Sequence, residues 1–138
     1  MKRTNRNIFL SIIFLLQTHL ILANEDILKK YLQEIKKTNP DFKEFSAEQG
    51  ESFFRTIIKN TKGENISCMT CHTQNPKNEG KTRANKIILP MAKVINPERF
   101  TDAAKIEKWF KRNCNDVFER ECTLKEKGNF LIYMISIK

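Results

Sequence analysis

Two cysteines and a histidine stand together in the segment Cys68-Met69-Thr70-Cys71-His72. This C-x-x-C-H spacing is the pattern at which haem c is attached. Two thiols one helical turn apart can each bond to a vinyl group of the haem, and the next residue can present its imidazole to the iron. A covalent haem would add a large apolar body to a small chain, so this motif constrains the fold more than any other feature of the sequence.

The first residues have the pattern of a secretory signal peptide, in which positive residues precede an apolar run and a small residue marks the cleavage point. The positive residues are Lys2, Arg3 and Arg6, and the small residue is Ala23. A transmembrane helix needs about 18 or more continuous apolar residues, which this stretch lacks, although an uncleaved anchor is the alternative. We expect residues 1–23 to be removed and residues 24–138 to be one soluble domain in the periplasm.

Export changes what the charged residues and the cysteines can do. Cleavage removes three of the 25 Lys and Arg residues and none of the 16 Asp and Glu residues, so the net charge of +9 falls to +6. The basic residues follow no aromatic-interleaved or helix-turn-helix pattern, so we expect no nucleic-acid binding. Thiols seldom remain free in an oxidising compartment, which disfavours a zinc site made of Cys68, Cys71, Cys114 and Cys122.

Apolar residues recur at helical spacing in four stretches and alternate convincingly in none, so we expect an all-α fold. One predicted helix occupies residues 25–38. The other three are expected to start at Ser46, at residues 101–102 and after Thr123. Ser46 with Gln49, and Thr123 with Glu126, form capping boxes. The lack of strands also argues against a C-x-x-C redox motif, which is expected beside a strand-helix unit.

The second predicted helix is followed by a long segment of different character. Its buried face is expected to comprise Phe53, Phe54, Ile57 and Ile58, and Gly50 would let another helix come close. Residues 73–100, by contrast, are polar and irregular. A loop of that length in a small domain usually wraps something or has a function. We therefore expect four helices around one long functional loop.

The sixth ligand of the iron stays open on spacing alone. His72 is expected to supply the fifth ligand, and no other histidine remains after cleavage, so the candidates are a Met, an Asn, a Lys or no protein ligand. Met91 lies in the long loop, where an ordinary His/Met cytochrome places its ligand, and Met is the common partner. Asn113 lies on an apolar helix face that would meet the haem. Spacing favours Met91, because an Asn at a helix end is usually a cap.

The stretch from Asn96 to Asn115 reads NPERFTDAAKIEKWFKRNCN, and ERECT follows at residues 119–123. The motif GKTR at residues 80–83 and the C-x-x-C-H motif precede it. In content and order, these segments resemble the sphaeroides haem protein (SHP) family of monohaem cytochromes c over residues 46–135. The resemblance implies a small, class I-like cytochrome c helical fold around one covalent haem c, with residues 24–138 as the monohaem cytochrome c domain.

The resemblance also changes the choice of sixth ligand. In the SHP family this ligand is the Asn immediately before the first cysteine of a C-x7-C pair, which implies Asn113 here and leaves Met91 as packing. The cysteine pair forms a disulfide in the family, which implies a bond between Cys114 and Cys122. An amide oxygen is a hard ligand that suits ferric iron. Asn113 is therefore expected to leave on reduction and to open a position for O2, NO or CO.

The expected function is electron transfer with transient binding of small gases, rather than enzyme catalysis. The resemblance implies a dihaem cytochrome c and a membrane cytochrome b as redox partners. Lys81, Arg83 and Lys86 are candidate contacts for the haem propionates or for an acidic partner, with solvated loop charges as the alternative. Three other functions stay open: a His72/Met91 electron carrier, a haem enzyme such as a peroxidase, and a zinc- or disulfide-stapled binding protein.

Overall fold

The computed structural model describes residues 25–138, so the predicted signal peptide over residues 1–23 lies outside the described residues. The described part begins with a helix over residues 25–38, here called the N-terminal helix. The later helices are α2 (Ala47–Arg55), α3 (Met69–His72), α4 (Ala103–Phe118) and α5 (Leu124–Ser136). Short strands lie between α2 and α4, namely β1 (Ile58–Lys59), β2 (Asn65–Ile66), β3 (Gly80–Lys81) and β4 (Ile87–Ile88).

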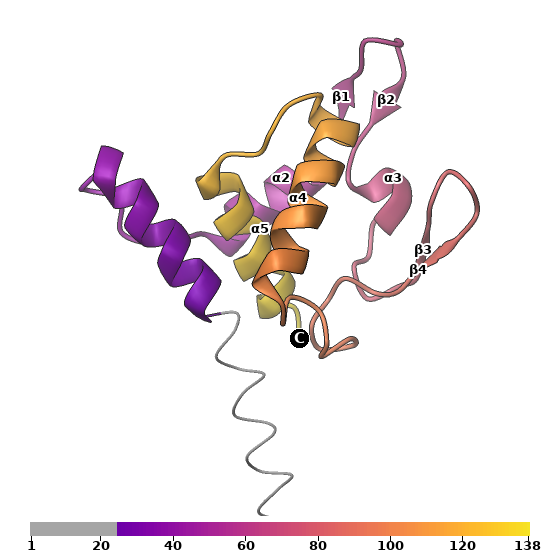
Figure 1. Cartoon of the computed structure of the whole chain (residues 1–138). Coiled ribbons are helices and arrows are strands. Elements are labelled where there is room, and N and C mark those ends of the chain that lie inside the picture. Colours follow the sequence, from indigo (N-terminus) through magenta and orange to yellow (C-terminus); the bar gives the residue numbers. More distant parts are fainter. Residues whose placement is uncertain (1–24) are drawn as a thin grey trace, which may run out of the picture.

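The helices form the body of the molecule, as predicted for an all-α fold. In Figure 1, the N-terminal helix, α2, α4 and α5 lie together, and α3 lies with two small hairpins to one side of α4. We call these four longer helices the helical scaffold, and we call residues 57–93, which contain α3 and both hairpins, the attachment segment. No helix within residues 25–138 is both long enough and apolar enough to span a bilayer.

The expectation of a chain without strands is wrong in detail. Strand β1 pairs with β2 in an antiparallel ladder through Ile58 and Ile66, and β3 pairs with β4 through Gly80 and Ile88. Each strand has only two residues. A strand of two residues is too short to show the alternation of apolar and polar residues by which a strand is recognised in a sequence.

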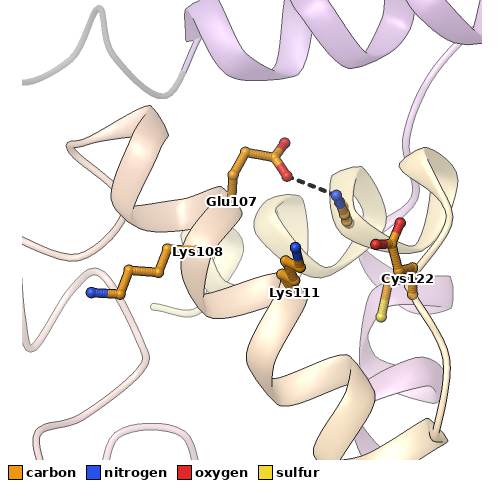
Figure 2. A pocket seen from close by; sticks show the side chains of 6 residues that line it. Glu107, Lys108, Lys111 and Cys122 are labelled. Atoms are coloured by element: carbon orange, nitrogen blue, oxygen red, sulfur yellow. Dashed lines mark hydrogen bonds and ion pairs between the residues drawn. The ribbon is translucent and has the colours of Figure 1, made fainter.

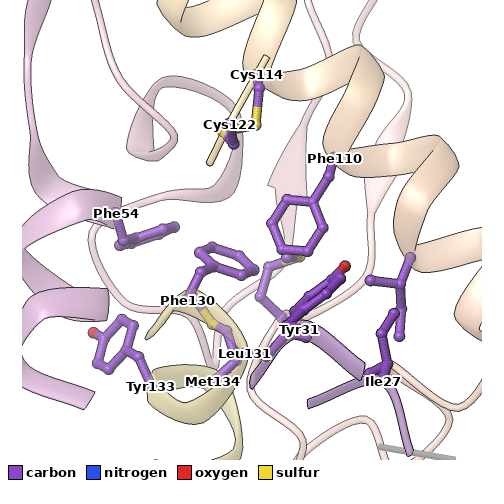
Figure 3. Close-up of a cluster of buried hydrophobic side chains, with 12 residues drawn as sticks. Ile27, Tyr31, Phe54, Phe110, Cys114, Cys122, Phe130, Leu131, Tyr133 and Met134 are labelled. Carbon is purple, nitrogen blue, oxygen red and sulfur yellow. A yellow bond between two sulfur atoms is a disulfide. The ribbon is translucent and has the colours of Figure 1, made fainter. Parts of the chain in front are cut away.

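The core of the scaffold is rich in aromatic side chains. Phe54 and Met134 are 0% exposed, and Tyr31 is 1% exposed. The ring of Phe130 lies 5.5 Å from that of Phe110 and 6.3 Å from that of Phe54, between centroids, so one ring from each of α2, α4 and α5 meets there (Figure 3). Burying such a side chain contributes about 1.5–3 kcal/mol, so this cluster is the main source of the stability of the scaffold.

Helices α2 and α5 cross at very short range, as Gly50 predicted. A Cβ atom at Gly50 would overlap the backbone carbonyl group of Asn129. The side chain of Asn129, 4% exposed, accepts from the backbone amide of Ser46 over 2.9 Å and donates to the side chain of Gln49 over 3.0 Å. The predicted capping box at Ser46 is therefore half right. Its hydroxyl accepts from the Gln49 amide over 3.1 Å, but Asn129 replaces Gln49 as the partner of the Ser46 amide.

The second capping box, Thr123 with Glu126, forms as predicted. The predicted end of the second helix is wrong, because α2 ends at Arg55, Ile57 is 63% exposed and Ile58 belongs to β1. Three β-branched residues in a row, Thr56-Ile57-Ile58, favour extended backbone over helix.

A polar network fastens the N-terminal helix to the rest of the scaffold. The hydroxyl of Tyr31 donates to Oε1 of Glu107 over 2.5 Å, and Nζ of Lys127 donates to Oε2 of Glu107 over 2.7 Å. Burial alone would raise the pKa of Glu107, but the hydrogen bonds from Lys127 and Tyr31 outweigh it and lower that pKa. The carboxylate of α4 thus holds the N-terminal helix and α5 together.

Candidate functional site

The C-x-x-C-H motif folds as one helical turn. The backbone amides of Cys71 and His72 donate to the carbonyl oxygen of Cys68 over 3.3 and 3.1 Å. Just before the turn, the amide of Ser67 donates to the hydroxyl oxygen of Thr70 over 3.0 Å. Cys68 and Cys71 are free cysteines that are only partly buried. Two thiols and an imidazole therefore stand on a single turn, which is the arrangement that haem attachment needs.

Strand β3 packs directly on this turn. Gly80 is buried, and a Cβ atom there would overlap the carbonyl oxygen of Cys71 and lie 3.0 Å from the Cα atom of His72. Only a residue without a side chain allows so close an approach of two backbones. Gly80 therefore fixes the second hairpin against the motif, which is a physical role for the first residue of the GKTR segment.

The environment of the motif suits a metal-binding imidazole. Burial, with a smaller contribution from the positive charge of Arg99, lowers the pKa of His72 to about 4. The ring is then neutral at pH 7, and one ring nitrogen has a lone pair for a metal ion. Burial also raises the pKa of the Cys68 thiol to about 12.

Arg99 anchors the long loop close to His72. Its guanidinium group donates to the carbonyl oxygen of Leu89 over 2.6 Å and to that of Pro90 over 3.0 Å. Burial lowers the pKa of Arg99. No motif in the sequence singles out this residue, and its only signal is that it stands in the SHP-like stretch. The structure shows that it holds the loop immediately before Met91.

Met91 lies in the hydrophobic core. It is 7% exposed and belongs to the same buried cluster as Phe130 and Met134. Its backbone amide donates to the carbonyl oxygen of Pro76 over 2.8 Å, which ties the end of the attachment segment back to the turn after α3. This position favours packing over iron ligation for the Met91 side chain.

Asn113 lies near the end of α4, directly before a disulfide. Cys114 and Cys122 are bonded, with their Cα atoms 5.7 Å apart, so the disulfide joins α4 to the connection that leads into α5 (Figure 3). The Asn113 side chain is partly buried and makes no hydrogen bond to another residue within 25–138. The helix therefore holds an amide group whose oxygen is available to a ligand or a metal.

The apolar face of α4 that was expected to meet the haem divides in two. Ile106 and Phe110 are 5% and 8% exposed and belong to the scaffold core. Trp109 lies one turn before Asn113 and is 45% exposed. Trp109 and Asn113 therefore share the edge of the helix that the core does not cover.

The attachment segment also leaves large apolar side chains uncovered. Ile57 and Ile87 are each 63% exposed, and Leu89 is 57% exposed. They belong to the segment that contains the C-x-x-C-H motif. Trp109, which is also exposed, belongs to α4, the helix that lies beside α3 in Figure 1. A large apolar cofactor bonded to the motif would cover whichever of these side chains lie beside it, because burial of exposed apolar surface is favourable.

The three predicted basic contacts lie on one hairpin. Lys81 belongs to β3, and Arg83 and Lys86 lie in the turn before β4, where all three are exposed. The guanidinium group of Arg83 lies 3.8 Å from the carboxylate of Glu64, a pair that links the two hairpins. An exposed pair of this kind is weak, so the hairpin presents basic groups to solvent beside the motif.

A pocket of about 240 Å³ lies elsewhere, between α4 and the start of α5. It is lined by Glu107, Lys108, Lys111, Glu121, Cys122 and Lys127. Figure 2 shows the ion pair from Glu107 that crosses it. None of its residues belongs to the C-x-x-C-H motif. Within residues 25–138, no cluster of three or more His, Cys, Asp or Glu side chains could hold a metal ion, which removes the basis for a four-cysteine zinc site.

Comparisons with known proteins agree with this geometry. Residues 40–134 match the model of the family described as "Domain of unknown function (DUF1924)". Cytochrome c'' of Methylophilus methylotrophus is 36% identical over 113 residues, which cover 81% of this chain and 78% of that protein. The cytochrome c-type protein SHP of Cereibacter sphaeroides is 42% identical over 88 residues, which cover 64% of this chain and 68% of that protein.

Solved structures of the same two proteins share the fold. The crystal structure of oxidised cytochrome c'' superposes with a TM-score of 0.77 at 34% identity, over 86% of this chain and 97% of that one. A solution structure of cytochrome c'', which concerns haem-ligand detachment, gives a TM-score of 0.75 at 35% identity, over 85% of this chain and 95% of that one. The structure of oxidised SHP, an oxygen-binding cytochrome c, gives a TM-score of 0.70 at 34% identity, over 83% of this chain and 96% of that one.

Proposed function

Because this chain matches the DUF1924 model and belongs to the SHP-like family of c-type cytochromes, we propose that it is a periplasmic electron carrier with one redox-labile axial ligand. The protein binds haem c covalently. In the proposal, Cys68 and Cys71 form the two thioether bonds, His72 holds the iron permanently, and Asn113 holds it in the oxidised protein. When bound, the haem supplies a centre that accepts and releases one electron.

The residues around the motif support this assignment of donors. The thiols of Cys68 and Cys71 are free, and the lowered pKa of His72 leaves its imidazole neutral. Leu89 and Trp109 present exposed apolar surface that a porphyrin would cover. The donor set and its surroundings are those that a covalent haem requires.

The observation that supports the proposal most strongly is the state of Asn113. Asn113 is partly buried, and its side-chain amide makes no hydrogen bond within residues 25–138 but is still reached by solvent, so its oxygen is free to coordinate a metal ion. The neighbouring Cys114–Cys122 bond holds its helix end in place. A firmly held amide oxygen without a competing hydrogen bond is suited to coordinate a metal ion bound beside it.

An amide ligand also makes the site sensitive to the redox state. The hard amide oxygen of Asn113 would bind ferric iron better than ferrous iron, so it would be expected to release the iron in the reduced protein. A small diatomic such as O2, NO or CO would then be able to bind there. Two relatives support this part of the proposal, because SHP is an oxygen-binding cytochrome c and the cytochrome c'' structure concerns haem-ligand detachment.

We place the protein in the periplasm, with residues 1–23 as a cleaved signal peptide and residues 24–138 as the haem domain. The Cys114–Cys122 disulfide supports this compartment, because such bonds persist in oxidising spaces. The intact mass of the purified protein tests it. Removal of residues 1–23 gives an N-terminus at Asn24, whereas an uncleaved anchor leaves the full chain.

The redox partner is expected to be acidic. The attachment segment contains seven Lys and Arg residues and only two Asp and Glu residues, and Lys81, Arg83 and Lys86 stand exposed within it. A dihaem cytochrome c with an acidic docking face, itself reduced by a membrane cytochrome b, fits this charge. Because complementary charges act mainly on the association rate, the electron-transfer rate should fall as ionic strength rises.

The visible spectrum of Asn113→Ala, oxidised and reduced, with and without CO, tests the ligand assignment. We expect the ferric spectrum to change, because the iron loses its sixth ligand, and the reduced spectrum with CO to stay as in wild type. Asn115→Ala is the matched control, since its side-chain amide is exposed and donates to the carbonyl oxygen of Lys111 over 2.7 Å. An unchanged ferric spectrum in Asn113→Ala contradicts the proposal.

The same spectra decide between Asn113 and Met91. A methionine ligand gives ferric haem a charge-transfer band near the red end of the visible spectrum. We expect no such band in wild type and no spectral change in Met91→Leu, because the Met91 side chain is buried in the core. A band that disappears in Met91→Leu would establish the His72/Met91 electron carrier instead.

A further inference from the structure

The residue that caps the C-terminal end of α4 has an unusual backbone conformation. Glu119 caps the helix with φ 54° and ψ 26°, in the left-handed region. Helices commonly end in this conformation, but the residue there is usually Gly or Asn, because a Cβ atom is unfavourable in it. A Glu at this position suggests that its side chain makes a contact that a glycine could not.

That contact is with the first hairpin. The backbone amide of Thr61 donates to both carboxylate oxygens of Glu119, over 3.1 and 3.2 Å. The hydroxyl of Thr61 donates to Oε1 of Glu119 over 2.6 Å. These hydrogen bonds lower the pKa of Glu119, so the carboxylate is charged at neutral pH and accepts all of them.

The turn of the hairpin leaves the Thr61 amide available for this contact. Asn60 closes the turn, because its side-chain oxygen accepts from the amides of Lys62 and Glu64 over 3.0 and 2.9 Å. The amide of Gly63 donates to the carbonyl oxygen of Asn60 over 2.9 Å. The Thr61 amide therefore has its partner in α4 rather than within its own turn.

One of the two joined elements leads into the attachment turn, and the other contains Asn113. Strand β2 of the hairpin leads through Ser67 directly into Cys68 and the attachment turn. Helix α4 holds Asn113, and its C-terminal end lies beside the β1–β2 hairpin in Figure 1. Within residues 25–138, no other hydrogen bond joins α4 or its cap to residues 58–66. The disulfide at Cys114 connects α4 only to the α4–α5 connection.

We propose that Glu119 and Thr61 form a clasp that sets the separation between the attachment turn and α4, and so keeps Asn113 within reach of the iron. The inference rests on the proposed ligation by His72 and Asn113. Glu119 and Thr61 are positioning residues, because they act through Asn113. Opening the clasp lets α4 move away from the attachment turn, so the ligand-free state of the oxidised protein becomes more populated.

Two measurements on the haem-loaded protein test the clasp. Hydrogen exchange followed by mass spectrometry reports the opening of residues 58–66. Titration of the oxidised protein with imidazole reports how easily an outside ligand displaces Asn113. In Glu119→Gly, which removes the carboxylate and relaxes the left-handed backbone, we expect faster exchange in the hairpin and an imidazole affinity about twofold to fivefold higher, the range for an exposed hydrogen-bonded pair.

Further variants separate the clasp from its side effects. Thr61→Val removes the hydroxyl and keeps the amide, so its effects should be smaller and of the same sign. Asn85→Gly relaxes another left-handed residue, with φ 58°, in the second hairpin and should change neither measurement. In Asn113→Ala, the change Glu119→Gly should still speed exchange but should no longer alter imidazole affinity, because no ligand remains to be displaced.

The outcomes are distinct. Unchanged exchange in Glu119→Gly shows that the clasp does not hold the hairpin and overturns the inference. Faster exchange with unchanged imidazole affinity, in a protein whose ferric spectrum does respond to Asn113→Ala, shows a purely structural contact and also overturns it. If the ferric spectrum does not respond to Asn113→Ala, the proposed ligation itself is wrong, and the inference falls with it.

Discussion

The helical scaffold and the attachment segment are held together by different forces. Of the twelve residues in the buried core cluster, eleven come from the scaffold and its connections, and only Met91 comes from the attachment segment. The attachment segment relies instead on two short ladders, on the close packing of Gly80 against Cys71, and on links such as Glu119 with Thr61. It also leaves Ile57, Ile87 and Leu89 uncovered.

The difference indicates which part depends on the haem. The scaffold contains most of the buried apolar cluster, and burial of such surface is the main driving force of folding. The attachment segment has few buried side chains and short hydrogen-bonded ladders, which are the features of low local stability. We infer that the covalent haem completes the packing of the attachment segment, whereas the scaffold supplies a firm base for Asn113.

The scaffold should be the part most sensitive to loss of a core side chain. Phe54 is 0% exposed and lies among the rings of Phe130 and Tyr133. Phe54→Ala should lower the free energy of unfolding by about 3–5 kcal/mol, measured by guanidinium denaturation of the holoprotein. Ile95→Ala, at a position 52% exposed, is the control and should stay within about 0.5 kcal/mol of wild type. Equal losses in the two variants would show that the buried ring of Phe54 stabilises the scaffold no more than an exposed side chain does.

Adding one methyl group in each region should separate stability from haem loading. Gly80→Ala forces a Cβ atom against the carbonyl of Cys71 and should reduce the fraction of purified chains that contain haem, measured by intact mass. Gly50→Ala forces one against Asn129 in the scaffold and should lower the free energy of unfolding by about 1–3 kcal/mol, with haem loading in the folded chains unchanged. Full haem loading in Gly80→Ala would show that the close packing of β3 is not needed.

Loss of the polar network that fastens the N-terminal helix should have the smallest effect on stability, and this effect should depend on pH. The pKa of Glu107 is lowered in the folded protein, so its stabilisation is present above the unfolded pKa of about 4.3. It is lost as the pH falls through the lowered folded pKa. The melting temperature of Glu107→Gln should therefore lie below that of wild type at pH 7 and approach it at pH 3. Glu44→Gln, at an exposed position, should follow wild type at both values.

Much of the local structure could be predicted from the sequence. Helices α2, α4 and α5 begin where expected, after Ser46, Asp102 and Thr123, because the side chains that cap a helix stand within a few positions of its start. The close approach of another helix at Gly50 was also predictable, since a glycine on an apolar helix face leaves room for a neighbouring backbone. The end of α2 was not, because the β-branched run Thr56-Ile57-Ile58 overrode the helical spacing of its apolar residues.

In the candidate site, too, some features could be predicted from the sequence and others could not. The attachment turn follows from the C-x-x-C-H spacing, whereas the core position of Met91 could not be read from its place after Pro90 in a long loop. Likewise, nothing in the sequence pairs Arg99 with the carbonyl groups of Leu89 and Pro90. These contacts depend on how the loop folds back, which no local pattern determines.

The sequence by itself determined the attachment turn, the helix caps and the family to which the chain belongs, because each depends on residues close together along the chain. Only the tertiary structure decided how the end of α4, the helix that contains Asn113, is joined to the hairpin before the attachment turn. Glu119 reaches Thr61 across 58 positions of sequence, and Tyr31 reaches Glu107 across 76. Such contacts arise when distant segments pack together, so their partners exist only in the folded chain.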